Sequence, residues 1–258
     1  MCDHPDVDEE SFSRRIADRL AALPGVEAVA LGGSRALGTH RVDSDWDFAL
    51  YYRGGFAPES LREVGWPGEV SELGAWGRIF NGGAWLRVED LPVDVHFRDL
   101  DEVEREIVQA QRGSFRFEPL LFHLAGIPSY LLLAELATGR VLRGQLPHPD
   151  FPSRLRESAR STWWSYAELV FEYARANHAP HGRVAQCTAL LTQAASQSAH
   201  AVLAGRGEWI TNEKRLLSRA GLEELDVIVR RARPDSLGET VRAARALCSA
   251  AVTAAGER

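Results

Sequence analysis

The chain has no long hydrophobic run and few cysteine, lysine or methionine residues. No apolar stretch of its 258 residues reaches the roughly 18 to 20 residues that a membrane-spanning helix needs. The acidic start MCDHPDVDEESF lacks the basic and apolar regions of a secretory signal. We therefore expect a cytoplasmic protein that has no membrane partner.

Cysteine is scarce, and its positions exclude two classes of protein. The three residues, Cys2, Cys187 and Cys248, lie far apart and form no C-x-x-C pair. Neither a disulfide framework nor a zinc site of that type is indicated. We expect three free thiols, with Cys187 and Cys248 on helices.

Positive charge is too scarce for a protein that wraps long nucleic acid. The net charge is −6, and residues 1–149 carry 15 arginines against 24 acidic residues. Residues 150–258 carry 15 basic and 12 acidic residues. Binding to long nucleic acid requires a continuous basic surface. Long nucleic acid is therefore not expected as a partner, whereas a single nucleotide needs far less positive charge.

Lysine occurs once, at Lys214, in a chain whose other basic residues are all arginine. Two readings are open. The lysine is a chance survivor of a bias toward arginine, or it marks a site where a compact ammonium works and a planar guanidinium does not.

Hydrophobic periodicity divides the chain into an α/β half and a helical half. Helices are predicted at 11–22, 58–64, 100–111 and 128–138, and strands at 26–31, 45–52, 84–89, 92–98 and 139–144. The proline-rich stretch 145–152 is the predicted linker. Helical spacing dominates after it, with helices expected over about 159–174, 184–201, 212–221 and 236–255.

The stretch LGGSRALGTHRVDSDWDFAL, residues 31–50, joins a glycine turn to a cluster of aspartates. If 45–50 is a strand, Asp45 and Asp47 share one face and Trp46, Phe48 and Leu50 point into a core. The alternative is a solvated loop after the turn.

A third aspartate lies on the later predicted strand, within VDVHFRD. Val93, Val95 and Phe97 share one face of this strand, while Asp94 shares the other with His96 and Arg98. Asp94 either joins the other two aspartates or is a rim carboxylate that pairs with Arg98.

Three aspartates held together repel one another unless a cation lies between them. Mg²⁺ takes oxygen ligands, usually one or two protein carboxylates together with phosphate and water. Gly32 and Gly33 let a phosphate approach the backbone N–H groups, and Ser34 adds a hydroxyl. Arg35 and Arg41 either steer phosphate or lie in solvent.

This pattern resembles the nucleotidyltransferase superfamily of the DNA polymerase beta type. Gly33-Ser34 is followed by Asp45-Trp46-Asp47, and Asp94 lies on a later strand. Within the superfamily the chain is similar to the aminoglycoside and lincosamide nucleotidyltransferases and their uncharacterised bacterial relatives. The resemblance implies an α+β fold: a nucleotidyltransferase domain over 1–147, with a mixed sheet flanked by helices, then an all-helical domain over 148–258 that completes the nucleotide and acceptor cleft.

The resemblance also implies a reaction and its residues. Asp45, Asp47 and Asp94 would be catalytic and would bind two Mg²⁺ ions, and Gly33, Ser34 and Lys214 would bind the nucleotide, the lysine from the segment WITNEKRL. The enzyme would transfer a nucleoside monophosphate, AMP from ATP being favoured, to a hydroxyl of a small molecule such as an aminoglycoside-like antibiotic. Pyrophosphate would leave. Asp94 is a candidate general base, as are Glu135, His96 and Asp99.

Two other functions stay open at this point. One is an enzyme of the toxin–antitoxin type that nucleotidylates a protein or a tRNA. The other is a module that binds a nucleotide without turnover.

Overall fold

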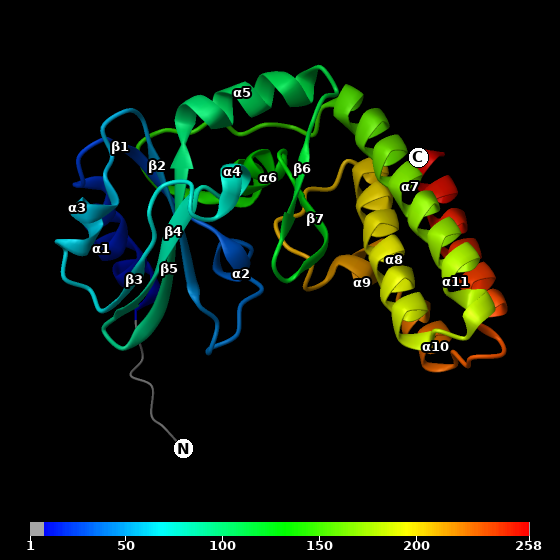
Figure 1. Cartoon of the computed structure of the whole chain (residues 1–258). Helices are drawn as coiled ribbons and strands as arrows, with labels where there is room; N and C mark the ends of the chain where they lie inside the picture. The colour runs from blue at the N-terminus through cyan, green and yellow to red at the C-terminus, as the bar shows by residue number, and fades with distance from the viewer. Residues whose placement is uncertain (1–7, 258) are drawn as a thin grey trace. The chain divides into compact units, whose positions relative to one another are not determined.

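The computed structural model describes residues 8–257, which fold into two compact units (Figure 1). Of these residues, the first unit comprises those up to Ile107 together with Leu132–Pro149, and the second comprises Val108–Leu131 together with those from Asp150 onward. Cys2 lies outside the described residues.

A six-stranded mixed sheet forms the centre of the first unit, in the order β3-β4-β5-β2-β1-β8. Its strands are β1 (Val26–Leu31), β2 (Trp46–Tyr52), β3 (Gly68–Val70), β4 (Gly82–Val88), β5 (Leu91–Asp99) and β8 (Arg140–Arg143). Strands β2 and β5 pair in parallel, and the other neighbours pair antiparallel. The mixed sheet predicted from the resemblance is confirmed.

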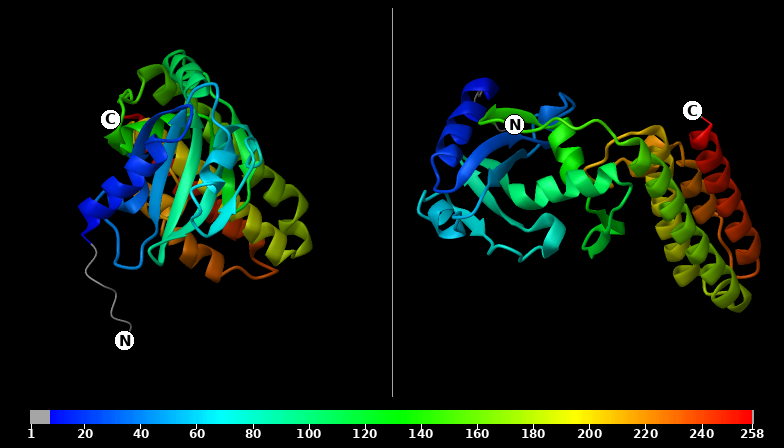
Figure 2. Two further views of the ribbon diagram at one scale, coloured as in Figure 1. Left: turned by 90° about the vertical axis from the view of Figure 1, so that its left-hand side faces the viewer. Right: turned by 90° about the horizontal axis from the view of Figure 1, so that it is seen from above.

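One face of this sheet is apolar and covered by α1 (Glu9–Ala21) and α3 (Pro58–Arg62) (Figure 2). Alternate residues of β2 and β5 point into this core: Trp46, Phe48, Leu50, Val93, Val95 and Phe97 are all nearly fully buried. Burial of these side chains fixes which residues face the other way, because side chains alternate along a strand.

The opposite face carries the polar residues of the central strands. Three further helices accompany the sheet: α2 (Gly33–Ala36), α4 (Gly77–Phe80) and α6 (Leu131–Thr138). The Arg98 guanidinium is 1% exposed and donates to both carboxylate oxygens of Glu135, at 2.5 and 2.7 Å. It also donates to the carbonyl of Phe80. This buried, bidentate ion pair connects α6 to β5.

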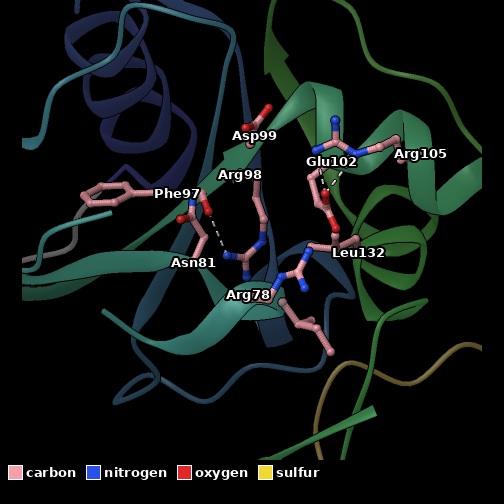
Figure 3. Close-up of a pocket in the computed structure, with 9 residues that line it drawn as sticks. Arg78, Asn81, Phe97, Arg98, Asp99, Glu102, Arg105 and Leu132 are labelled. Carbon is pink, nitrogen blue, oxygen red and sulfur yellow. Dashed lines mark hydrogen bonds and ion pairs between the residues drawn. The ribbon is translucent and has the colours of Figure 1, made fainter. Parts of the chain in front are cut away.

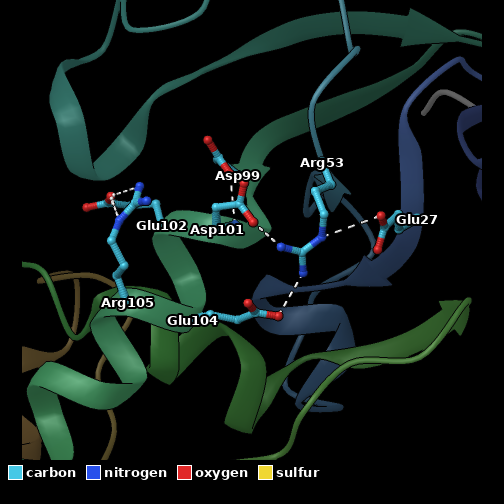
Figure 4. A network of polar contacts seen from close by, with 7 residues as sticks. All are labelled: Glu27, Arg53, Asp99, Asp101, Glu102, Glu104 and Arg105. Atoms are coloured by element: carbon cyan, nitrogen blue, oxygen red, sulfur yellow. Dashed lines mark hydrogen bonds and ion pairs between the residues drawn. The ribbon is translucent and has the colours of Figure 1, made fainter.

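Helix α5 (Leu100–Gln111) follows β5 directly, and a network of charges surrounds its first turn (Figure 4). Asp99 accepts a hydrogen bond from the backbone N–H of Asp101 at 2.8 Å. The Arg53 guanidinium contacts the carboxylates of Glu27, Asp101 and Glu104. Because these groups are substantially exposed, their ion pairs contribute little to stability.

The second unit is built mainly from helices. Its long helices α7 (Ser153–Asn177), α8 (Val184–Arg206) and α11 (Leu237–Gly256) run side by side (Figures 1 and 2). Shorter elements complete it: the 3₁₀ turn η1 (Ala179–His181), the helices α9 (Leu216–Ala220) and α10 (Glu224–Arg230), and a hairpin of β6 (Phe117–Leu120) and β7 (His123–Pro128). Trp163 is fully buried in this unit and donates to the hydroxyl of Tyr130 at 2.8 Å.

Most predicted elements are confirmed, and several were missed. The strand at 26–31 and the helix at 100–111 match β1 and α5 residue for residue. The hairpin β6–β7, helix α10 and strand β3 were not predicted. The predicted helix at 128–138 begins three residues later, because residues up to Pro128 belong to β7.

Cys187 and Cys248 are free, buried thiols on α8 and α11, as expected. Burial raises the pKa of Cys248 to about 11, so this thiol is protonated at neutral pH. None of the helices in residues 8–257 combines the length and apolar character needed to cross a lipid bilayer.

The Arg98–Glu135 pair predicts a large effect of Glu135→Gln on the stability of the first unit. The substitution leaves the buried Arg98 charge without its counter-charge, which lowers local stability by about 2 kcal/mol or more. Amide hydrogen exchange along β5 should then accelerate about thirtyfold. The control Glu172→Gln removes one member of an exposed pair with Arg175 and should change nothing measurable. Equal exchange rates in the two variants would contradict a stabilising role of the buried pair.

Candidate active site

The glycine turn after β1 packs directly against Asp47. The N–H of Gly32 donates to the carbonyl of Asp47 at 2.7 Å. Gly33 has a φ of +59°, and a Cβ atom added there would lie 1.8 Å from Oδ2 of Asp47. Only glycine fits at this position, both for its backbone conformation and for its contact. Ser34 follows it in α2 and is half-buried.

Two of the three aspartates lie side by side on the polar face of the sheet. In the parallel pairing of β2 with β5, Asp47 is the register partner of Asp94. Both are half-buried, and their neighbours along each strand point into the core. Asp45 is exposed and precedes the first residue of β2, so the predicted strand starts one residue later than expected.

Arg35 fastens the loop that carries Asp45, a role that sequence reasoning missed. Its guanidinium donates to the carbonyls of Ser44 and Asp45 and to the carboxylate of Glu9. It also lies 4.0 Å from the centre of the Trp46 ring, and its side chain is only 6% exposed. Arg35 is therefore neither a solvent residue nor a free phosphate-binding group, whereas Arg41 is exposed beside Asp43.

The segment around Lys214 is held by its neighbour, Glu213. The Glu213 carboxylate accepts hydrogen bonds from the N–H groups of Leu124 and Ala125 on β7, at 2.6 and 3.0 Å. Burial opposes its ionisation, but the nearby His200 imidazole and these two N–H groups together hold the pKa of Glu213 below its usual value. Lys214 itself is exposed, and its N–H donates to the side chain of Asn212.

The structure thus brings together part of the predicted site. Gly33, Asp47 and Asp94 form one local group in the first unit, with Ser34 and Asp45 on the segments next to it. Lys214 belongs to the second unit, and its contact with a nucleotide stays a prediction. The anchoring role of Glu213 was not predicted, because its partners are 88 and 89 residues away in the sequence.

Asp47 and Asp94 suit a Mg²⁺ ion whose other ligands are phosphate oxygens and water. Among residues 8–257, no group of three or more His, Cys, Asp or Glu side chains could hold a metal by itself. The Asp47–Asp94 pair supplies the one or two carboxylates that Mg²⁺ usually takes when phosphate oxygens and water complete its coordination.

The three alternative candidates for the general base, Glu135, Asp99 and His96, are each engaged by neighbouring groups or weakened as a base. Glu135 is bound by Arg98, and Asp99 accepts a hydrogen bond from the first turn of α5. Burial and the nearby Arg98 charge lower the pKa of His96 to about 4, which makes it a weak base. Arg98 pairs with Glu135 and with backbone carbonyls, in place of the alternative pairing with Asp94.

A pocket of about 160 Å³ lies elsewhere on the first unit, lined by Arg78, Arg98, Asp99, Glu102 and Arg105 among others (Figure 3). Its lining includes neither Asp47 nor Asp94. It is smaller than a typical nucleotide or drug-sized site, and an ion pair of Glu102 with Arg105 occupies its rim. We therefore do not assign the nucleotide to it.

The first unit thus places a glycine turn against Asp47, beside the Asp47–Asp94 pair on a mixed sheet. Residues 13–114 match a family model described as the nucleotidyltransferase domain. Over these residues the chain is similar to the nucleotidyltransferase superfamily, in agreement with the resemblance that the sequence motifs indicate.

Comparisons over the whole chain are more distant. A nucleotidyltransferase-like protein from Exiguobacterium sibiricum 255-15 aligns over 96% of this chain and 76% of its own, with 13% identity and a TM-score of 0.46. A likeness this remote carries no inference about activity. A search of curated proteins finds no match.

The contact between Gly33 and Asp47 predicts unequal effects of two glycine substitutions. Gly33 and Gly38 both have positive φ, but a Cβ at Gly38 meets no atom within 4 Å. Gly38→Ala should lower the free energy of unfolding by about 1 kcal/mol, from backbone strain alone. Gly33→Ala should lower it by at least about 2 kcal/mol, because Asp47 must also move. Urea denaturation measures both values, and equal losses would contradict the contact.

Proposed function

We propose that the chain is a Mg²⁺-dependent nucleotidyltransferase that moves a nucleoside monophosphate, AMP from ATP, to a hydroxyl of a small molecule. The observation that carries the proposal is the in-register pairing of Asp47 with Asp94, next to the glycine turn. The family match over residues 13–114 supports nucleotidyl transfer in general. The donor, the metal and the acceptor go beyond that match, and they are proposed from the resemblance together with these residues.

In the proposed reaction, the acceptor oxygen forms a bond to the α-phosphorus while the bond from this phosphorus to the bridging oxygen of pyrophosphate breaks. Two Mg²⁺ ions, when bound, would neutralise charge on the attacking and leaving oxygens. Asp45, Asp47 and Asp94 would hold them. Asp94 would also accept the proton of the attacking hydroxyl.

The remaining residues would bind and orient the donor. The backbone N–H groups at Gly33 and Ser34, together with the Ser34 hydroxyl, would contact the leaving phosphates. Lys214 would add a compact positive charge to the phosphates. Arg35 would keep Asp45 in place through its bonds to the carbonyls of residues 44 and 45. We propose that the nucleotidyltransferase domain spans residues 1–147. A helical domain over 148–258, which includes Lys214, would complete the nucleotide and acceptor cleft.

The acceptor is proposed to be a small hydroxylated molecule, such as an aminoglycoside-like compound. The acidic surplus of residues 1–149 suits a cationic acceptor. A protein or tRNA acceptor, or a nucleotide sensor without turnover, would share the donor site and differ only in the step after nucleotide binding.

The proposal predicts metal-dependent nucleotide binding. Non-hydrolysable ATP, GTP, CTP and UTP analogues are titrated calorimetrically into the full chain with Mg²⁺ or with a chelator. We expect the ATP analogue to bind most tightly, and only with Mg²⁺. Asp45→Asn/Asp47→Asn should weaken binding at least about thirtyfold, because two carboxylates lose their charge.

Asp43→Asn is the matched control for this titration. It removes one negative charge from the same loop, and Asp43 is exposed beside Arg41, so binding should stay near that of the unmodified chain. Absence of binding for all four analogues would contradict the proposal. A second assay measures pyrophosphate release from ATP itself in the presence of different acceptors. Release only with a protein or tRNA acceptor would favour the toxin–antitoxin alternative, and nucleotide binding without release for any acceptor would favour the sensor.

A further inference from the structure

A half-exposed tryptophan lies directly beside Asp94. Trp85 is the register partner of Asp94 in the antiparallel pairing of β4 with β5. Its neighbours along the strand, Ala84 and Leu86, are buried in the core. Trp85 therefore projects from the polar face, on the same side as Asp94, and its exposed fraction is 53%. Side chains in such opposite positions have Cβ atoms about 4.5–5.5 Å apart.

A second tryptophan stacks on the first. The rings of Trp76 and Trp85 have centroids 4.6 Å apart and planes at 29°. Gly83 makes room for this stack, because a Cβ there would lie 2.5 Å from the Trp76 ring. The His96 ring lies nearly perpendicular to the Trp76 ring, with centroids 6.3 Å apart.

The loop that carries Trp76 is fastened at both ends. The Asn81 side chain accepts a hydrogen bond from the N–H of Gly74 and donates to the hydroxyl of Tyr52. The Ser71 hydroxyl accepts a hydrogen bond from the N–H of Gly83. The Trp76–Trp85 stack is thus a preformed aromatic surface, and the Trp85 ring is its more exposed member.

The order of the strands decides which substrate this surface would meet. The glycine turn ends β1, Asp47 is on β2, Asp94 on β5 and Trp85 on β4, and these strands are consecutive neighbours in the sheet. In a phosphoryl transfer the attacking and leaving oxygens lie roughly in line. If pyrophosphate leaves beside the glycine turn, the attacking hydroxyl arrives from the side of β4.

We propose that the Trp76–Trp85 stack is the acceptor platform and that it binds a saccharide ring, with a ring hydroxyl directed toward Asp94. This inference rests on the proposed function for the direction of transfer. A saccharide offers both parts that the site requires: an apolar C–H face that lies flat on an indole, and hydroxyls at the ring edge. An amino sugar adds a cation, which the face of tryptophan attracts.

Saturation-transfer NMR on the full chain tests the platform directly. The probes are methyl glucoside, glucosamine and kanamycin, each measured with and without Mg²⁺ and the ATP analogue. We expect transfer from the protein to the ring protons of at least one probe. Trp85→Leu should reduce the affinity of the chain for that probe about tenfold, because a stacking surface is lost. Trp85→Phe should retain most of the affinity.

Arg87→Leu serves as the control, because Arg87 is exposed on β4 two residues beyond Trp85. It should leave saccharide binding unchanged, and all three variants should bind the ATP analogue as the unmodified chain does. No transfer to any of the three probes, or equal affinities in Trp85→Leu and the unmodified chain, would overturn the platform. If the unmodified chain does not bind the ATP analogue, the proposed function is overturned instead. The two failures are distinguishable because saccharide binding is also measured without the analogue.

Discussion

The parallel pairing of β2 with β5 is the constraint on which the rest of the site depends. It makes Asp47 and Asp94 register partners on one face of the sheet. Like charges on directly opposite residues of neighbouring strands repel one another. The strands stay paired because the opposite face is buried in a continuous apolar core that contains Trp46, Phe48 and Val95. Burial of several large side chains outweighs this repulsion, and a bound cation would turn the repulsion into attraction.

The other parts of the site are positioned relative to this pair. On one side the glycine turn packs on Asp47, and Gly33 leaves the space that the carboxylate occupies. On the other side Trp85 lies opposite Asp94. Arg35 holds the loop before β2, and the buried Arg98–Glu135 pair fixes the strand end beyond Asp94. Four consecutive strands thus carry a glycine turn, two carboxylates and an aromatic stack, so the order of strands in the sheet sets the order of the groups across the site.

Local sequence pattern predicted the strands and their faces because alternation needs only neighbouring residues. The burial of Val93, Val95 and Phe97, with Asp94 on the other face, follows from such alternation. The partners of Arg98 and Glu213 could not be predicted, because Glu135 is 37 residues from Arg98 and the two N–H groups that bind Glu213 are more than 80 residues away. Beyond the helix predicted at 58–64, the stretch up to residue 83 gave no prediction, because Gly65, Gly68, Gly74 and Gly77 adopt positive φ and interrupt any periodic pattern. The β6–β7 hairpin was missed because its turn residues, Leu121 and Phe122, are apolar and yet exposed.

Anomalous diffraction from crystals grown with Mn²⁺ and a non-hydrolysable ATP analogue tests the central claim most directly. Mn²⁺ replaces Mg²⁺ at oxygen sites and gives an anomalous signal. The account predicts a metal peak bound to oxygens of both Asp47 and Asp94, at about 2.0–2.2 Å, with phosphate density reaching Gly33 and Ser34. Bound nucleotide with no metal at either carboxylate, or metal bound only elsewhere on the chain, would contradict it.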